Sequence, residues 1–233
     1  MIRNALRRFR GVRFVCRAPT RSGQPAELRV TEMTLSHVRW WNSHVQPIID
    51  RDPERPDRGW NWLLYVSFAT LVDKLLSRKP AGYTVGMVAR ESGCLIPCAL
   101  VQVMGRFPGL DDHDKTGAFV WFLSTAPDEA LRTVAGYPLS EERLPKRLGS
   151  IALDVATTHS LNRPTRGRLA LYADAAGGKP LVDWYRSRGM EVLEDEKRLP
   201  LVPRRLFRPS DGRYCYYTPA ASLRASRELD PLR

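Results

Sequence analysis

The sequence is poor in cysteine and has no long apolar run. Its 233 residues include only four cysteines, Cys16, Cys94, Cys98 and Cys215. They are too few and too scattered for a disulfide framework, so we expect a reducing compartment. The longest apolar stretch, residues 62–72, is interrupted by serine and threonine and is shorter than the 18 or so residues of a membrane-spanning helix. The sequence therefore predicts no membrane span.

Several common enzyme motifs are also missing. No G-x-S-x-G, G-x-G-x-x-G or H-E-x-x-H sequence occurs in the chain. A phosphate-binding loop is excluded as well, because Pro180 follows Gly178-Lys179 where that loop needs Ser or Thr. Cys94 and Cys98, four positions apart on an extended strand, would lie about 13 Å apart, too far to share a zinc ion. We expect no metal site and interpret both cysteines as buried, unreactive thiols.

Acidic residues are absent from the first 26 positions, which hold seven arginines. The whole chain has a net charge of +12, so the rest of it is only mildly basic. The N-terminus lacks the apolar segment of a secretory signal. Its arginines and lack of acids are also typical of a transit peptide, but its scarcity of serine favours a basic extension, residues 1–25, of a cytoplasmic protein.

The composition is that of a globular protein, with 43% hydrophobic and 27% charged residues. Apolar periodicity predicts a single α+β domain, residues 26–219, followed by a short tail, residues 220–233. Strands are expected at residues 26–31, 83–90, 99–104, 118–124, 167–174, 190–193 and 213–218. Helices are expected at residues 36–45, 64–75, 145–160 and 180–189.

Two further patterns predict the roles of individual side chains. Ser36 is a plausible N-cap of the first helix. The second helix carries apolar residues at i, i+4, i+7, i+8 and i+11, a spacing that predicts a buried face made of Leu64, Phe68, Leu71, Val72 and Leu75.

Most histidines and acids give weak signals. We expect structural roles for the helical histidines His37, His44 and His159. The turn around Asp112 and His113 holds four ligand-type residues whose side chains diverge, which favours an exposed turn. The alternative is a role for Asp112 or His113 as a general base, because loops on a rigid sheet carry much functional chemistry.

The segment GRLALYADAAGGKPLVDWYRSRGMEVL, residues 167–193, gives the strongest signal. It resembles the C-terminal half of the GNAT superfamily of acyl-CoA-dependent N-acetyltransferases, whose pattern is A-x-x-[F/L]-Y-x-x-x-G-[F/M/L]. The residues on this pattern are Leu181, Trp184, Tyr185, Gly189 and Met190. The order of expected elements resembles the family from residue 26 to residue 219. The resemblance implies a mixed, mostly antiparallel sheet with splayed fourth and fifth strands and helices on both faces.

The resemblance also implies acetyl-CoA as co-substrate. Its pantetheine arm would contact the backbone of Leu123, Ser124 and Thr125 on the fourth strand. Its pyrophosphate would lie at the start of the following helix, against Lys146, Arg147, Leu148, Gly149 and Ser150. Only Gly149 matches the family's pyrophosphate motif, since Leu144 and Arg147 stand at its Gln/Arg and Gly positions. Charge on Lys146 and Arg147 is expected to contribute instead.

Two roles in chemistry follow from the same resemblance. Tyr185 would be the general acid that protonates the departing thiolate, or else a core tyrosine. In this family the first two helices edge the acceptor site. Trp40, Trp41, Trp60 and Trp62 would form its aromatic wall, or at least two of them would pack the helices on the sheet.

The predicted function is transfer of an acetyl group from acetyl-CoA to an unidentified amine. Two alternatives remain open at this point. One is a GNAT-like protein that binds acyl-CoA or a partner with little turnover. The other is a nucleic-acid-associated protein that uses its arginine-rich N-terminus. The sequence does not determine the oligomeric state.

Overall fold

A computed structural model of the chain shows a single mixed sheet. The described residues are 14–76, 80–88, 93, 95–134, 140–195, 197 and 210–233. Within them, eight strands pair in the order β1-β2-β3-β4-β5-β6-β8-β7. Their bounds are β1 Phe14–Ala18, β2 Ala26–Glu32, β3 Ala81–Val88, β4 Leu95–Pro108, β5 Thr116–Thr125, β6 Leu169–Tyr172, β7 Glu191–Val192 and β8 Tyr214–Tyr217. All neighbours are antiparallel except β5 and β6.

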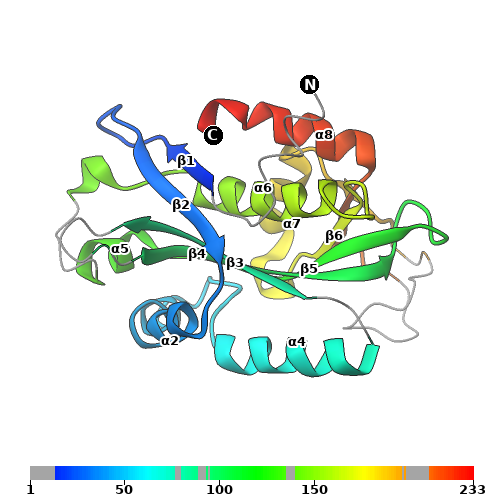
Figure 1. Cartoon of the computed structure of the whole chain (residues 1–233), viewed down its shortest axis with the longest axis horizontal. Helices are drawn as coiled ribbons and strands as arrows, with labels where there is room; N and C mark the ends of the chain where they lie inside the picture. Colours follow the sequence, from blue (N-terminus) through cyan, green and yellow to red (C-terminus); the bar gives the residue numbers. More distant parts are fainter. Residues whose placement is uncertain are drawn as a thin grey trace.

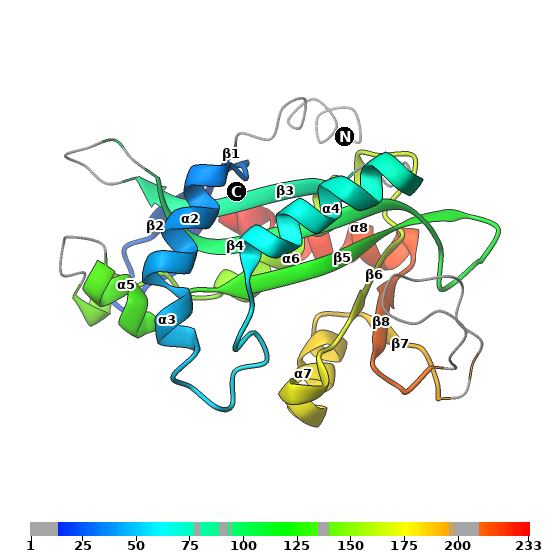
Figure 2. The same cartoon turned by 90° about the horizontal axis from the view of Figure 1, so that it is seen from below.

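Helices cover both faces of this sheet, as Figure 1 shows. Their bounds are α2 Leu35–His44, α3 Gln46–Ile49, α4 Trp62–Leu76, α5 Asp128–Val134, α6 Leu148–Leu161, α7 Gly178–Ser187 and α8 Pro219–Glu228. Helices α2 and α4 lie on one face, and α6 and α8 lie on the other (Figure 1). The view from below in Figure 2 shows α4 running across the sheet. The predicted fold class, a mostly antiparallel mixed sheet with helices on both faces, is confirmed.

Helix starts differ from the expected positions by a few residues, for local reasons. Helix α2 begins after Thr34, not Ser36, because the Thr34 side chain accepts from the His37 amide in a capping box. Helix α6 begins at Leu148, after Pro145, because Arg147 takes a left-handed conformation with φ 62°. The segment between the expected strand at residues 118–124 and the expected helix at residues 145–160 contains α5, which the sequence did not predict. No described helix is long and apolar enough to cross a membrane.

Both ends of the predicted domain need a correction. Strand β1 lies inside the segment predicted as a basic extension, yet it pairs with β2 from Phe14↔Val30 to Ala18↔Ala26 and buries Cys16. Residues 220–233, predicted as a tail, form most of α8 and pack on α6. The folded domain therefore includes residues 14–18 and 220–233. Sequence patterns missed both segments because each is short and buries only alternate or sparse residues.

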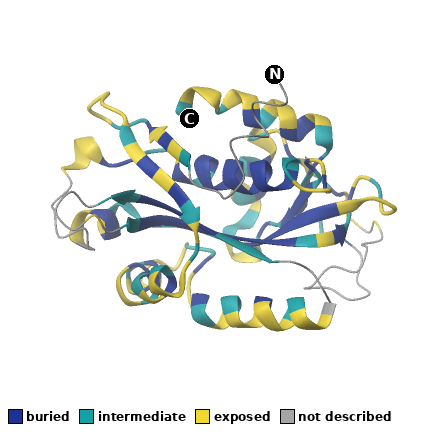
Figure 3. Cartoon of the chain, in the orientation of Figure 1, coloured by how far each residue is buried: buried dark blue, intermediate teal, exposed yellow. Residues whose placement is uncertain are grey.

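The predicted buried face of α4 is wrong. Leu64, Phe68, Leu71 and Leu75 are 61%, 48%, 49% and 71% exposed. The other side of the helix, where Trp62 and Ala69 are almost fully buried, packs most closely on the sheet. Of the predicted residues, Val72 is half-buried against the core, and the half-exposed Phe68 ring lies 5.4 Å from the Trp121 ring of β5. Figure 3 shows that the side of α4 that faces away from the sheet is mostly exposed. Because nearly every residue of α4 is apolar, the spacing alone could not indicate which stripe faces the sheet.

Candidate active site

The site begins where β5 and β6 separate. The two strands pair only from Ala118↔Leu169 to Val120↔Leu171, although β5 continues to Thr125. The pairing of β5 with β4 also shifts register at this point, with Gln102 opposite Phe122 and Val103 opposite Val120. Trp121 is therefore an extra residue in β5, a β-bulge of the kind that bends a strand. The splayed strands expected from the sequence are present.

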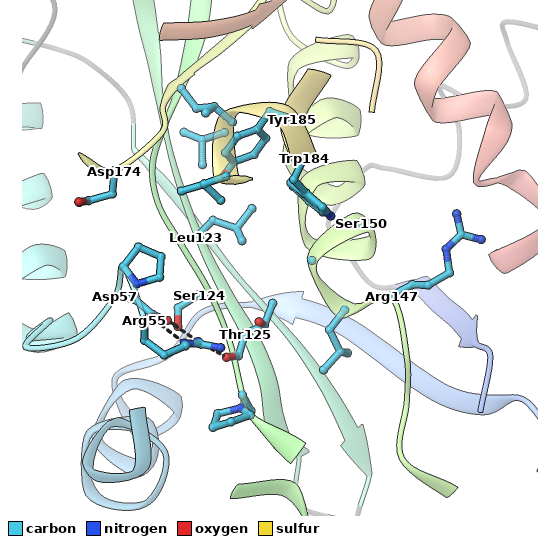
Figure 4. Close-up of a pocket in the computed structure, with 18 of the residues that line it drawn as sticks. Arg55, Asp57, Leu123, Ser124, Thr125, Arg147, Ser150, Asp174, Trp184 and Tyr185 are labelled. Carbon is cyan, nitrogen blue, oxygen red and sulfur yellow. Dashed lines mark hydrogen bonds and ion pairs between the residues drawn. The ribbon is translucent and has the colours of Figure 1, made fainter. Parts of the chain in front are cut away.

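A cavity of about 580 Å³ fills the opening between these strands. On one face of the sheet it is lined by the loop between α3 and α4, and on the other by the start of α6 (Figure 4). The end of β5 and helix α7 form its remaining walls. Because the loop between α3 and α4 and the start of α6 lie on opposite faces, the cavity crosses the sheet. Two reactants could approach each other through it from opposite sides.

The open edge of β5 presents backbone groups to this cavity. The Ala126 amide donates to the Cys98 carbonyl of β4 at 2.8 Å, so Ala126 and Ser124 direct their backbone groups toward β4. Leu123 and Thr125, which alternate with them, direct theirs away from β4 into the opening. Of the three residues predicted to contact pantetheine, Leu123 and Thr125 have suitable backbone directions and Ser124 does not.

The start of α6 offers free amides at the other end of the cavity. The first bond of the helix runs from the Ile151 amide to the Arg147 carbonyl at 3.0 Å. The amides of Leu148, Gly149 and Ser150 precede it and have no acceptor within the helix. Together with the helix dipole, they form a site suited to an anion. A Cβ at Gly149 would lie 3.3 Å from the Trp184 ring, so glycine lets α6 and α7 approach closely.

The two basic residues predicted for this site differ in their surroundings. The ammonium of Lys146 pairs with the Asp128 carboxylate at 2.9 Å, and its amide donates to the Pro19 carbonyl. Arg147 is exposed, and Figure 4 shows its side chain directed away from Leu123 and Thr125. Arg188, which the sequence did not single out, also lines the cavity, with its guanidinium 5.4 Å from the centre of the Trp184 ring.

Tyr185 lies in the wall of the cavity on α7 (Figure 4). Its side chain is buried, and its hydroxyl makes no hydrogen bond to any described residue. Burial, with a smaller contribution from Cys215, raises the pKa of Tyr185 well above its ordinary value. The hydroxyl therefore keeps its proton at neutral pH and can donate it to a group inside the cavity.

The four predicted tryptophans separate into different roles. Trp41 and Trp62 are fully buried and pack edge-to-face at 6.4 Å, so they belong to the core and cannot contact a substrate. Trp40 stacks on His44 and does not line the cavity. Only Trp60 does so. The alternative that at least two of these residues pack the helices is therefore correct.

Asp112 and His113 are not near the cavity. They lie in the turn between β4 and β5, whereas the cavity is at the opposite end of β5. Eight residues of strand separate Thr116 from Ser124, which is about 26 Å. The Asp112 carboxylate accepts from the Asp114 amide and shapes its own turn. The prediction of either residue as a base is corrected.

The remaining predictions concern thiols and histidines. Cys16, Cys98 and Cys215 are buried, and burial raises the pKa of each thiol to about 12, so they stay protonated and unreactive. Cys94 lies outside the described residues. His159 is buried and hydrogen-bonded to Tyr83 at 2.5 Å, in keeping with a structural role.

Sequence reasoning missed a buried polar network at the cavity, in the loop between α3 and α4. Arg55 donates from Nε and Nη2 to both carboxylate oxygens of Asp57, at 2.8 and 2.6 Å. Its Nη2 also donates to the Thr125 carbonyl at 2.7 Å, and the Ser124 hydroxyl donates to Asp57. Figure 4 shows this cluster at the end of β5. Sequence patterns assign no role to this loop, because nothing in its residue spacing indicates a contact with β5.

No family model and no curated protein matches this sequence. The search of solved structures matched spermidine N-acetyltransferase from Vibrio cholerae in complex with CoA and spermine. The two chains are 12% identical with a TM-score of 0.48, over 84% of this chain and 98% of the other. A GNAT-family acetyltransferase of Staphylococcus aureus matched at 10% identity and a TM-score of 0.48, over 81% and 97% of the chains.

A third match was Arabidopsis thaliana NAA60 in complex with a bisubstrate analogue. It is 11% identical with a TM-score of 0.43, over 82% of this chain and 98% of the other. The matched structures are thus of the kind that the resemblance in the sequence predicts. With TM-scores below 0.5, they carry no argument about what this chain binds or catalyses.

Proposed function

We propose that the protein transfers an acetyl group from acetyl-CoA to an amine. The observation that carries this proposal is the cavity that crosses the sheet between β5 and β6. It joins an unpaired strand edge, a helix N-terminus and a buried tyrosine in one channel. A thioester with a long peptide-like arm and a pyrophosphate has the groups that these three features would bind.

The donor would enter from the α6 face. Its pyrophosphate would accept from the amides of Leu148, Gly149 and Ser150, and Arg188, which also lines the cavity, would add charge. Its pantetheine amides would pair with Leu123 and the Thr125 amide on the open edge of β5. The Thr125 carbonyl is already an acceptor for Arg55, so we assign it no contact with pantetheine.

The chemistry is direct transfer. The amine nitrogen attacks the thioester carbonyl carbon, the C–S bond breaks, and the sulfur leaves with the bonding electrons. Tyr185 donates its proton to this thiolate, and the nitrogen loses a proton to water as the amide forms. A free thiol has a pKa of about 8.5, lower than that of the buried tyrosine, but the same burial raises the basicity of a thiolate inside the cavity.

Two measurements test the proposal. Calorimetric titration should show acetyl-CoA binding to the intact protein, and an amine panel should give release of free thiol. Tyr185→Phe should lower turnover by about 10²-fold while leaving acetyl-CoA affinity nearly constant. Tyr216→Phe is the matched control, because its hydroxyl bonds Glu191 outside the cavity.

Each outcome has a separate meaning. Binding of acetyl-CoA without thiol release for any amine would indicate an acyl-CoA-binding protein with little turnover. No binding would contradict the proposal as a whole. If the Tyr185→Phe variant has a lower melting temperature but an unchanged kcat, Tyr185 has only a packing role. Residues 1–13, which hold five of the N-terminal arginines, lie outside the described residues, so nucleic-acid contact stays a prediction.

A further inference from the structure

Arg55 stands where the second reactant would enter. It belongs to the loop between α3 and α4, on the face of the sheet opposite α6, and it lines the cavity. Its Nε and Nη2 are held by Asp57 and the Thr125 carbonyl, and its Nη1 makes no hydrogen bond to any described residue. The guanidinium is thus fixed in place while one terminal nitrogen remains for a ligand.

The loop that carries Arg55 is itself held in several places. The carbonyl of Asp57 accepts from the Gln46 side chain at 2.9 Å, and the Asp50 carboxylate accepts from the Gly59 amide at 2.8 Å. Asp57 is only 3% exposed, so its contacts with Arg55 and Ser124 exclude water. A donor fixed this firmly loses little conformational entropy when it binds an oxygen.

The carboxylates around the cavity leave little negative charge with which a second ammonium group could pair. Asp57 is neutralised by Arg55, and Asp128 is paired with Lys146. Asp174 accepts from the Ala176 amide as the cap of a short turn. A polyamine would need a carboxylate for each of its extra charges, and two of the three carboxylates that line this cavity within the described residues are already paired with cations. The chemistry of the lining is suited to an acceptor of a different class.

The same side of the cavity has flat apolar walls. Trp60 and Trp121 both line it, and neither carries charge. Trp60 is fixed by edge-to-face packing on Phe122, with ring centres 5.1 Å apart. An apolar or aromatic body could pack against these indole rings while a polar group reaches Arg55.

We propose that the acceptor is a monoamine that bears a carbonyl or carboxylate oxygen and an apolar body, and that Arg55 binds this oxygen through Nη1. Asp57 is then a positioning residue that fixes the guanidinium. This inference rests on the proposed acetyl transfer and names its acceptor class. The proposal predicts that the protein prefers amines that carry this oxygen to amines that lack it. Without the oxygen, the fixed Nη1 donor of Arg55 would remain desolvated and without an acceptor.

A matched series of amines tests the inference with the intact protein. Phenylalanine and phenylalaninamide carry the oxygen, phenethylamine has the same ring and amine without it, and spermine represents polyamines. We expect that kcat/KM for either phenylalanine or phenylalaninamide, whichever is higher, exceeds kcat/KM for phenethylamine by about tenfold or more. Phenylalanine against its amide distinguishes a carboxylate from a neutral carbonyl.

Variants then assign the discrimination to Arg55. Arg55→Gln alone would leave the buried Asp57 unpaired, so the double variant Arg55→Gln/Asp57→Asn keeps a neutral polar pair. In it, the ratio of kcat/KM between phenylalaninamide and phenethylamine should fall about tenfold, while the protein still binds acetyl-CoA. Arg51→Gln is the matched control, because Arg51 is in the same region but is exposed and does not line the cavity.

The outcomes separate this inference from the function on which it rests. A folded double variant with an unchanged ratio, or an intact protein that prefers spermine or phenethylamine, would overturn the role of Arg55 and leave acetyl transfer standing. No turnover of any amine by the intact protein would overturn the proposed function and the acceptor class together. A loss of discrimination confined to the double variant would support the proposal.

Discussion

Helices α4 and α6 lie on opposite faces of the same sheet and differ in what covers them. Both are rich in apolar residues over 15 and 14 positions. Helix α6 lies between the sheet and α8, and nearly all its residues are buried. Helix α4 buries one side against the sheet, and the leucines of its opposite stripe are exposed along the whole length of the helix.

This difference shows that apolar spacing identifies a stripe but not its environment. In α6 both the sheet side and the α8 side are buried, so even polar residues such as Thr157 and Ser160 are enclosed. In α4 the apolar stripe with the most regular helical spacing is the one exposed to solvent, and Trp62 and Ala69 are buried against the sheet. Five predictions test this comparison.

The largest effect is expected where α8 and the residues after it close over α6. Asp154 is 6% exposed and is bound by Arg233 through Nη2 at 2.5 Å and Nε at 3.1 Å. Arg233→Gln should lower the free energy of unfolding by about 3–5 kcal/mol at pH 7, because it leaves a buried carboxylate without its cation. Urea unfolding measures the loss, and exposed Arg227→Gln on α8 is the control.

The same variant has a predicted pH dependence. Burial raises the pKa of Asp154, an effect that Arg233 opposes, so removing Arg233 should raise that pKa further. An acid whose pKa is raised by folding favours the folded state at low pH and loses this contribution as pH rises through the folded value. The deficit of Arg233→Gln should therefore shrink toward acid. A deficit that is constant with pH would mean that the pair is not what stabilises this contact.

A slightly smaller loss is expected from a cavity in the α6 core. Leu153 is 3% exposed, and Leu153→Ala should cost about 3 kcal/mol through lost burial and imperfect collapse of the surroundings. Chemical denaturation at pH 7 gives the value. A cost near zero would show that α6 is less tightly enclosed than its burial indicates.

Acid should weaken α6 through His159. Burial, with help from Arg163, lowers the pKa of His159 from 6.5 to about 4. A base whose pKa is lowered by folding stabilises the protein above its unfolded value and loses that contribution as pH falls from 6.5 toward 4, by roughly 2–3 kcal/mol. His159→Gln should flatten the stability curve in this window relative to the parent chain. Exposed His113→Gln is the matched surface substitution.

The smallest effect is expected on the bare stripe of α4. Leu71 is 49% exposed, so Leu71→Gln should change the free energy of unfolding by about 0.5 kcal/mol or less. The measurement is the same denaturation used for Leu153→Ala, which makes the two leucines a direct test of the contrast. A loss of 2 kcal/mol or more would mean that the stripe is covered in solution.

The candidate site divides in the same way between what spacing can and cannot reveal. Tyr185 and Gly149 were accessible because each belongs to one continuous element that matches part of a family pattern, and the same resemblance implied the splay of β5. Arg55 and Asp57 were not, because their partners Ser124 and Thr125 lie about 70 residues away in the chain. Asp112 and His113 were predicted from loop position alone, and position in a loop does not say which end of a strand the loop occupies.

Local periodicity and one short motif were enough to predict the alternation of strands and helices, the fold class and the position of the tyrosine on α7. They could not predict which stripe of α4 faces solvent, which tryptophans lie in the core, or how residues from two distant segments fix Arg55. These features depend on burial and on hydrogen bonds to neighbours across the sheet, and local spacing carries no information about which segment supplies those neighbours.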